Sequence, residues 1–282
     1  MLPDGRLHLQ HGPIDLIVGA DADPAATEAA FRAATARFAT VLDELCAELA
    51  GLRAEAGPGA PPLHGPVARR MAAVVRPHAA RGFITPMAAV AGAVADEVLV
   101  AMVAEAPLRR AYVNNGGDIA LHLAPGERFR VGMVDRPDRP GLFGAAEVRA
   151  DEPVRGIATS GWRGRSFSLG IADAVTVLAA TAAEADAAAT AVANAVNLPG
   201  HPAVRRTPAA ALQPDSDLRW RRVTTAVGAL TPNEIGRALD GGAHAAGRLL
   251  RDGLIAAAAM HCQGTTRVAG ASVLATREAV HA

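Results

Sequence analysis

The stretch MAAVAGAVADEVLVAMVAE, residues 87–105, most constrains what this chain can fold into. It follows Pro86 and carries Gly92 near its middle. Apolar residues occupy nearly every position, and a helix that is hydrophobic all round must be buried. Asp96 is the one charge that we expect to point inward. The stretch therefore predicts a central helix covered by a β-sheet.

The remaining pattern supplies that sheet. Residues 7–21 alternate on both sides of Gly12-Pro13 and predict a β-hairpin. Further strands are expected over residues 110–114, 118–123, 128–135, 145–150, 155–159, 173–181, 221–228 and 253–261. Helices are expected over residues 24–56, 66–76, 182–197 and 232–251. Meandering strands with separate helices indicate an α+β fold, with helices packed on a mainly antiparallel sheet.

The charge balance excludes several function classes. The formal net charge is zero, so the chain has no excess positive charge to bind a phosphate backbone. We therefore expect no nucleic-acid partner. The chain of 282 residues contains no lysine, which excludes a Schiff-base lysine, a P-loop lysine and a lysine general base. A bound anion must then be held by arginine, by backbone N–H groups or by a metal.

Cysteine usage and hydropathy suggest a cytoplasmic protein. Cys46 lies in an alanine-rich helical run and is expected in the core, and Cys262 follows His261 on a strand. Adjacent strand residues point to opposite faces, so a thiol–imidazole pair is not expected. We find no signal-peptide pattern and no uninterrupted membrane-spanning stretch, so no membrane partner is expected. The oligomeric state is left open.

The run Asn114-Asn115-Gly116-Gly117-Asp118 lies between two expected strands. A hairpin turn explains Asn-Gly, since both residues accept positive φ. Paired glycines also let a ligand approach the backbone, and an aspartate beside them can hold a hydroxyl, an amine or a metal. Both interpretations stay open on the residues alone.

Two further motifs carry polar groups. Thr159-Ser160-Gly161 ends an expected strand with hydroxyl and N–H groups that suit a flavin or phosphate pocket, or an ordinary turn. Asp186 and Thr190 share a helical face and offer two oxygen ligands for a hard cation such as Mg²⁺. Alternatively, Asp186 serves a helix N-terminus and Thr190 bonds back to its own helix. Gly92 allows close approach of a ligand or of another helix.

In this order the motifs resemble the ApbE superfamily, the FAD:protein FMN transferases once called thiamine biosynthesis lipoproteins. VNNGGDI looks like the family's Val-Asn-x-Gly-Gly-Asp-Ile, and IATSGWRGR like its Ala-Thr-Ser-Gly segment followed by arginine. VTVLAATAAEADAAATAV is similar to its Val-Thr-Val strand and Ala-Asp-Ala-x-x-Thr helix. The matching stretches run from about residue 84 to 197 of an expected single ApbE-like domain, residues 1–282.

The resemblance implies an FAD pocket in which Mg²⁺ bridges the pyrophosphate. Asp186 and Thr190 would be metal ligands, with a backbone carbonyl near Gly92 as another. The nucleotide, a small-molecule partner, would be lined by Asn115, Gly116, Gly117, Asp118, Thr159, Ser160 and Gly161.

The sequence also departs from the family pattern. Ala91, Gly92 and Ala93 stand where the family has Lys-Gly-Tyr, and only RSFSLGIAD fills the place of its His-Ile-x-Asp-Pro-x-x-Gly stretch. The family's histidine therefore has no counterpart, and the chain resembles a shorter, cytoplasmic, uncharacterised branch. Asp173 could replace a lost ligand or simply start a strand. Trp162 could stack on a flavin or cover the edge of the core.

These patterns support three functional hypotheses. The leading one is a flavin- and Mg²⁺-binding protein that acts on the nucleotide pyrophosphate as a transferase or hydrolase. The alternative is a non-catalytic or accessory small-metabolite protein, for example in sulfur metabolism, with Cys262 as the residue to examine. The third is a scaffold in which the motifs only determine the fold.

Overall fold

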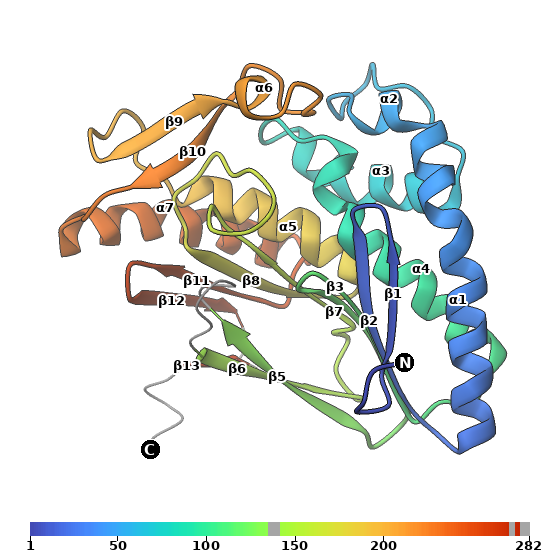
Figure 1. Cartoon of the computed structure of the whole chain (residues 1–282). Coiled ribbons are helices and arrows are strands. Elements are labelled where there is room, and N and C mark those ends of the chain that lie inside the picture. Colours follow the sequence, from blue (N-terminus) through green and yellow to red (C-terminus); the bar gives the residue numbers. More distant parts are fainter. Residues whose placement is uncertain (135–141, 271–273, 277–282) are drawn as a thin grey trace. The chain divides into compact units, whose positions relative to one another are not determined.

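The computed structural model describes residues 1–134, 142–270 and 274–276 (Figure 1). The chain divides into two compact units, and neither is continuous in sequence. The first consists of Met1–Phe129, Val148–Ala158 and Ala179–Ala187, and the second of Arg130–Glu147, Thr159–Leu178 and Ala188–Ala282. The single domain over residues 1–282 stays a prediction.

Antiparallel strands form the sheet of the first unit. Their order is β1, β2, β3, β4 and β7, with bounds Leu7–His11, Ile14–Asp21, Arg110–Asn115, Asp118–Leu123 and Gly156–Ser160. Val18 pairs with Val113, and Tyr112 pairs with Leu121. The hairpin expected over residues 7–21 is present as β1 and β2.

Helices complete this unit. They are α1 (Pro24–Ala47), α2 (Leu49–Leu52), α3 (Pro66–Ala79), the 3₁₀ turn η1 (Pro86–Ala89) and α4 (Val90–Glu105). The α4 helix contacts α1, α3, β3 and β4, and its Val94, Val98 and Met102 are fully buried. The prediction of an apolar helix packed on a sheet is confirmed, but its burial on every side is not, because Val100 and Val103 are exposed.

By length and composition, the stretch Pro86–Glu105 could also cross a membrane, and it is the one such helix among the described residues. Its contacts with neighbouring helices and strands place part of its apolar surface in this unit's own core, whereas Val100 and Val103 are exposed. The cytoplasmic location stays a prediction.

The second unit holds three groups of strands. The strands β8 (Ala174–Ala179), β11 (Ala257–Cys262) and β12 (Thr265–Gly270) pair antiparallel, with α7 (Pro232–Arg251) against β11 and β12. The strands β9 (Val204–Pro208) and β10 (Arg222–Val227) form a ribbon joined through α6 (Ala209–Leu212). A third sheet has the order β13 (Leu274–Thr276), β6 (Leu142–Arg149) and β5 (Arg128–Val134).

One helix is shared between the units. The first six residues of α5 (Ala182–Ala195) belong to the first unit, and the remainder belongs to the second. The predicted α+β class with mainly antiparallel strands is confirmed, because every pairing whose register is known is antiparallel.

Some local expectations differ from the structure. The helix expected over 24–56 breaks at Glu48, between α1 and α2. Cys46 is exposed, so its expected place in the core is wrong. Its neighbour Leu45 is buried instead, because one residue turns a helix by about 100°. Of the strand expected over 128–135, residue 135 lies outside the described residues.

Candidate functional site

The NNGGD run forms the tight turn between β3 and β4. Asn115 pairs with Asp118, so Gly116 and Gly117 are the two loop residues, with φ of +66° and +114°. The Gly117 N–H donates to Oδ1 of Asn114 at 2.8 Å. Positive φ at both central positions is the geometry that favours glycine in two-residue hairpin loops. The turn therefore accounts for both glycines without a ligand.

Asn115 connects this turn to the start of α4. Its side chain is buried, and its Nδ2 donates to the Ala91 carbonyl oxygen at 3.2 Å. A buried amide needs such a partner, because an unpaired one costs about 1–3 kcal/mol. The side chain of Asn115 thus holds the backbone to which Gly92 belongs.

Asp186 lies at the N-terminus of α4. Its Oδ2 accepts the Gly92 N–H at 3.0 Å, and the Ala91 N–H also bonds to this carboxylate. The first N–H groups of a helix lack partners within the helix, and its N-terminus favours a negative charge. Asp186 therefore caps α4 from a neighbouring helix.

Asp96 makes the reciprocal contact at the N-terminus of α5. Its two oxygens accept the N–H groups of Ala182 at 3.0 Å and Ala183 at 2.9 Å. A Cβ on Gly92 would stand 2.2 Å from the Ala182 carbonyl oxygen. Gly92 is thus needed for close helix packing, which was one of the two roles expected of it.

Burial and mutual repulsion govern the charges in this region. Burial raises the pKa of Asp186 well above its usual range, and the Asp118 carboxylate raises it further. Burial likewise raises the pKa of Asp96 to about 6, while the bonds from Ala183 and Ala182 oppose this shift. The described residues contain no group of three or more His, Cys, Asp or Glu side chains placed to hold a metal ion. The arrangement instead offers a pair of aspartates, Asp118 and Asp186.

The predicted ligand Thr190 lies one turn after Asp186 on α5, in the part of that helix that belongs to the second unit. Its role as a metal ligand stays a prediction. The same is true of the nucleotide-lining roles of Asn115, Gly116, Gly117 and Asp118.

Thr159 and Ser160 are the last two residues of β7, and Gly161 follows the strand; all three residues belong to the second unit. The Thr159 hydroxyl lies 2.9 Å from the Thr176 hydroxyl. A Cβ on Gly161 would stand 2.4 Å from the Asp173 carbonyl oxygen, so glycine is required there for backbone packing. Contact of these three residues with a flavin stays a prediction.

Asp173 is the centre of a hydrogen-bonded cluster. Its Oδ1 accepts from Nε of Arg163 at 2.7 Å and Nε1 of Trp162 at 3.2 Å, and its Oδ2 accepts from the Gln263 N–H at 2.6 Å. The Arg163 guanidinium lies 4.4 Å from the centre of the Trp162 ring. The carboxylate is 8% exposed. Asp173 therefore fastens the 161–173 loop to the end of β11.

The His261 ring and the Cys262 thiol have different hydrogen-bond partners. Nδ1 of His261 lies 2.8 Å from the Thr266 hydroxyl, whereas the Cys262 thiol donates to the Ile171 carbonyl oxygen at 3.7 Å. Burial raises the pKa of the Cys262 thiol to about 12, and the Asp173 charge adds to the shift. The thiol is therefore protonated at neutral pH and unreactive.

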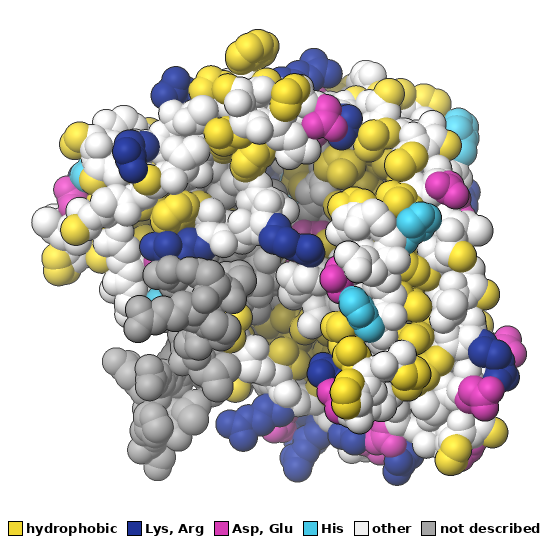
Figure 2. All heavy atoms as spheres, in the orientation of Figure 1, with side chains coloured by type: hydrophobic (Ala, Val, Ile, Leu, Met, Phe, Trp, Pro, Cys, Tyr) yellow, Lys and Arg dark blue, Asp and Glu magenta, His cyan; other side chains and the backbone are white. Residues whose placement is uncertain are grey.

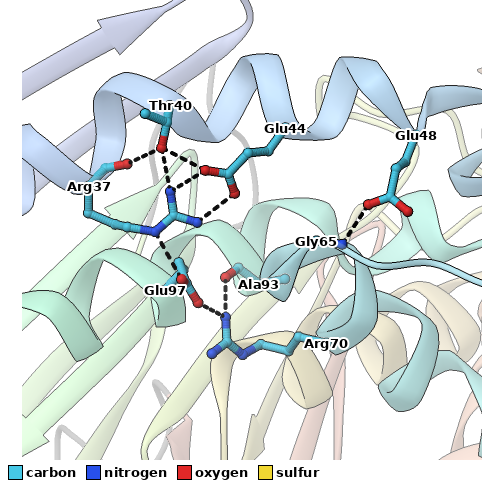
Figure 3. A network of polar contacts seen from close by, with 8 residues as sticks. All are labelled: Arg37, Thr40, Glu44, Glu48, Gly65, Arg70, Ala93 and Glu97. Atoms are coloured by element: carbon cyan, nitrogen blue, oxygen red, sulfur yellow. Dashed lines mark hydrogen bonds and ion pairs between the residues drawn. The ribbon is translucent and has the colours of Figure 1, made fainter.

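An ion network that the sequence analysis missed connects α1, α3 and α4 (Figure 3). Arg37 bonds Glu97 at 2.9 Å and Glu44 at 2.7 Å, and Arg70 bonds Glu97 at 2.7 Å and the Ala93 carbonyl oxygen at 3.3 Å. Glu97 is 13% exposed. The expectation that Asp96 is the one inward-pointing charge of α4 is therefore wrong. The i, i+7 spacing of Arg37 and Glu44 was the available signal.

Comparison with curated proteins finds archaeal relatives of part of the chain. A UPF0280 protein of Methanosphaerula palustris is 40% identical over 146 residues, which cover 48% of this chain and 55% of that protein. A UPF0280 protein of Methanothrix thermoacetophila is 38% identical over 141 residues, which cover 46% of this chain and 52% of that protein. The match thus spans about half the length of these relatives.

Comparison with solved structures supports the fold. The apo flavinyl transferase ApbE of Pseudomonas stutzeri superposes with a TM-score of 0.51 over 95% of this chain and 94% of that one, at 13% sequence identity. At this identity the likeness concerns the fold alone. The family model described as "AbpE bacteria" matches residues 1–268. Because this match covers nearly the whole sequence, the chain belongs to the AbpE bacteria family, within the ApbE-like superfamily.

Proposed function

We propose that the chain binds a flavin nucleotide of the FAD type together with Mg²⁺, where Asp118 and Asp186 meet the start of α4. The observation that carries this proposal is the placement of two carboxylates at one helix N-terminus: Asp186 bonds the Gly92 N–H, and Asp118 lies close enough to raise the pKa of Asp186 further, beyond the effect of burial. A bound cation would relieve both effects. Membership of the ApbE-like superfamily supports the choice of a flavin nucleotide.

The donor set fits Mg²⁺. This ion prefers oxygen ligands and is usually held by one or two carboxylates together with substrate phosphates, rather than by a cage of protein groups. Asp118 and Asp186 offer two carboxylates, and we keep Thr190 as a further proposed ligand. The chain has no lysine to hold a pyrophosphate. When bound, Mg²⁺ would neutralise charge on the phosphate oxygens.

A second candidate is nucleotide binding without turnover, as in an accessory protein. Asp173 was the residue best placed in the sequence to substitute for the missing histidine, and three donors already occupy its carboxylate. The protonated Cys262 thiol also argues against thiol chemistry for this candidate. The chain's own residues thus supply binding groups more clearly than a general base.

Calorimetry with FAD in Mg²⁺ and in EDTA tests binding. We expect binding in Mg²⁺ only, and an affinity at least tenfold weaker for Asp186→Asn, which is a loss of about 1.4 kcal/mol. The control Asp43→Asn changes an exposed carboxylate on α1 and should bind like the parent. FAD binding of equal strength in EDTA, or unchanged in Asp186→Asn, would contradict the proposed site.

Chromatography of the same mixtures separates the two candidates. Release of FMN and AMP from FAD would identify a pyrophosphate hydrolase, and intact FAD after saturating incubation would identify a binding protein. We expect no covalent flavin on an acceptor peptide by mass spectrometry, because the family's histidine stretch has no counterpart.

A further inference from the structure

The ribbon formed by β9, α6 and β10, residues 204–227, is an arginine-rich segment of the described chain. It carries five arginines against two aspartates, a formal charge of +3 in a chain whose net charge is zero. The arginines are Arg205, Arg206, Arg219, Arg221 and Arg222. Those at positions 205, 219 and 222 are exposed.

Large apolar side chains project from the same ribbon. Trp220 is 76% exposed, more than any other large hydrophobic side chain among the described residues, and Leu212 is 47% exposed. Figure 2 shows hydrophobic and basic side chains next to one another on the surface over α6 and its flanking strands. Apolar and cationic groups therefore share one surface here.

The backbone presents Trp220 in a defined and strained turn. Arg219 has φ of +53°, a conformation that costs a non-glycine residue about 1–2 kcal/mol. Its carbonyl oxygen accepts the Ala210 N–H at 2.7 Å, and the Arg221 N–H donates to the Leu218 carbonyl oxygen at 3.0 Å. Trp220 is thus exposed by an ordered backbone rather than by a loose one. Strain of this kind collects at binding surfaces.

We propose that this ribbon is a docking surface for an anionic lipid bilayer. Tryptophan favours the membrane–water interface, where its ring is apolar and its N–H stays solvated. Arginines beside it are attracted to anionic headgroups. Such a surface lies on a membrane without crossing it. This departs from the expectation of no membrane partner, which rested on the lack of a spanning stretch and of a signal peptide.

Other anionic partners fit the ribbon less well. A single-stranded nucleic acid stacks successive bases on several aromatic rings, and the ribbon has Trp220 alone. An aliphatic side chain such as Leu212 gains more from an acyl region than from a row of bases.

The two tryptophans of the chain allow a direct test. In Trp162→Phe, Trp220 becomes the one fluorescent tryptophan. With vesicles of equal parts phosphatidylglycerol and phosphatidylcholine at low salt, its emission should move to shorter wavelength and become protected from an aqueous quencher. High salt should reverse both changes, because about 1 M salt screens charges beyond about 3 Å. Vesicles of phosphatidylcholine alone should cause neither change.

Paired charge variants locate the contact. Arg205→Gln/Arg219→Gln should weaken vesicle binding about 25-fold, since each arginine near an anionic surface contributes about fivefold. Arg237→Gln/Arg251→Gln removes the same charge from α7 and should bind normally. The proposal is overturned if both double variants bind vesicles equally well or if the parent binds no vesicles. It is also overturned if the Trp220 emission responds to single-stranded DNA or to an acidic peptide but not to vesicles. If Trp162→Phe does not fold, co-sedimentation of the parent and Trp220→Ser with the same vesicles gives the same decision.

Discussion

Asp186 and Asp96 cap each other's helices: the Asp186 carboxylate accepts the Gly92 N–H on α4, and the Asp96 carboxylate accepts the Ala182 and Ala183 N–H groups on α5. Each carboxylate stands where a helix N-terminus attracts negative charge. The two aspartates thereby occupy positions that an anionic ligand could otherwise use. A pyrophosphate bound nearby must meet carboxylates, which is why the proposed site requires a cation.

Replacing Asp186 should reveal the cap apart from any ligand. Asp186→Ala leaves the N–H groups at the start of α4 without their partner, whereas Asp186→Asn keeps an acceptor oxygen. We expect the free energy of unfolding of the alanine variant to lie about 1 kcal/mol below that of the asparagine variant at pH 7. Urea unfolding measures this difference. Equal stability of the two variants would show that the cap is dispensable.

Asp96 should make stability fall as pH rises. Its pKa is about 6 in the folded chain and 3.8 in the unfolded chain, so the folded state keeps a proton that the unfolded state has lost. The stability associated with neutral Asp96 is present below pH 3.8 and is lost as pH rises through 6, by up to about 3 kcal/mol. The side chain of Asp96→Asn stays neutral at every pH. The free energy of unfolding of this variant, measured in urea, should therefore rise relative to that of the parent between pH 4 and 7.5. A constant difference across this range would contradict the shift.

His78 should act in the opposite direction. Burial, with a further contribution from Arg81, lowers its pKa from 6.5 to about 4, and its Nδ1 has no hydrogen-bond partner among the described residues. The stability associated with neutral His78 is fully present above pH 6.5 and is lost as pH falls through 4, by up to about 3 kcal/mol. His78→Leu lacks this titration. Its unfolding free energy relative to the parent should rise on acidification, and a flat difference would show that His78 titrates normally.

Gly117→Ala separates turn geometry from ligand space. A Cβ at Gly117 meets no atom within 4 Å, but φ of +114° strains any other residue. We expect a loss of about 1–3 kcal/mol in urea unfolding. Gly57→Ala, in equally open space without positive φ, should change little. Under conditions where both proteins are fully folded, Gly117→Ala should bind FAD at least tenfold more weakly than the parent. Equal affinity would show that the stretch is only a turn.

The two cysteines should differ in reactivity. Cys46 is exposed, whereas Cys262 is buried with its pKa raised to about 12. Because the thiolate is the reactive form, a disulfide reagent at pH 7.5 should titrate one thiol in the native chain and two in urea. Cys46→Ser should abolish the native reaction. Rapid labelling of Cys262 in that variant would contradict its burial.

The sequence was most informative where local signals agreed. The helix expected over 232–251 has those bounds, because Thr231 and Glu234 form a capping box ahead of an amphipathic run. The strand β9 and helix α6 were missed, because their arginines and alanines show neither alternation nor a helical stripe of useful length.

Contacts between distant residues could not be predicted in the same way. Asp186 was assigned to a helix face correctly, but its partner Gly92 lies 94 residues earlier. Gln263, which completes the Asp173 cluster, lies 90 residues after that carboxylate. Spacing within one helix or strand reports on its own face, and it carries no information about which other segment that face meets.

The same separation has a consequence for synthesis on the ribosome. The start of α4 is made 94 residues before Asp186. At about 5–20 residues per second, its N-terminal cap arrives roughly 5–20 seconds later. Until then the apolar α4 can pack on α1, α3, β3 and β4, but its N-terminus has no cap. The nascent chain therefore passes through a state in which its most hydrophobic helix has no N-terminal cap, and in this interval we expect the helix to benefit most from a trigger-type chaperone.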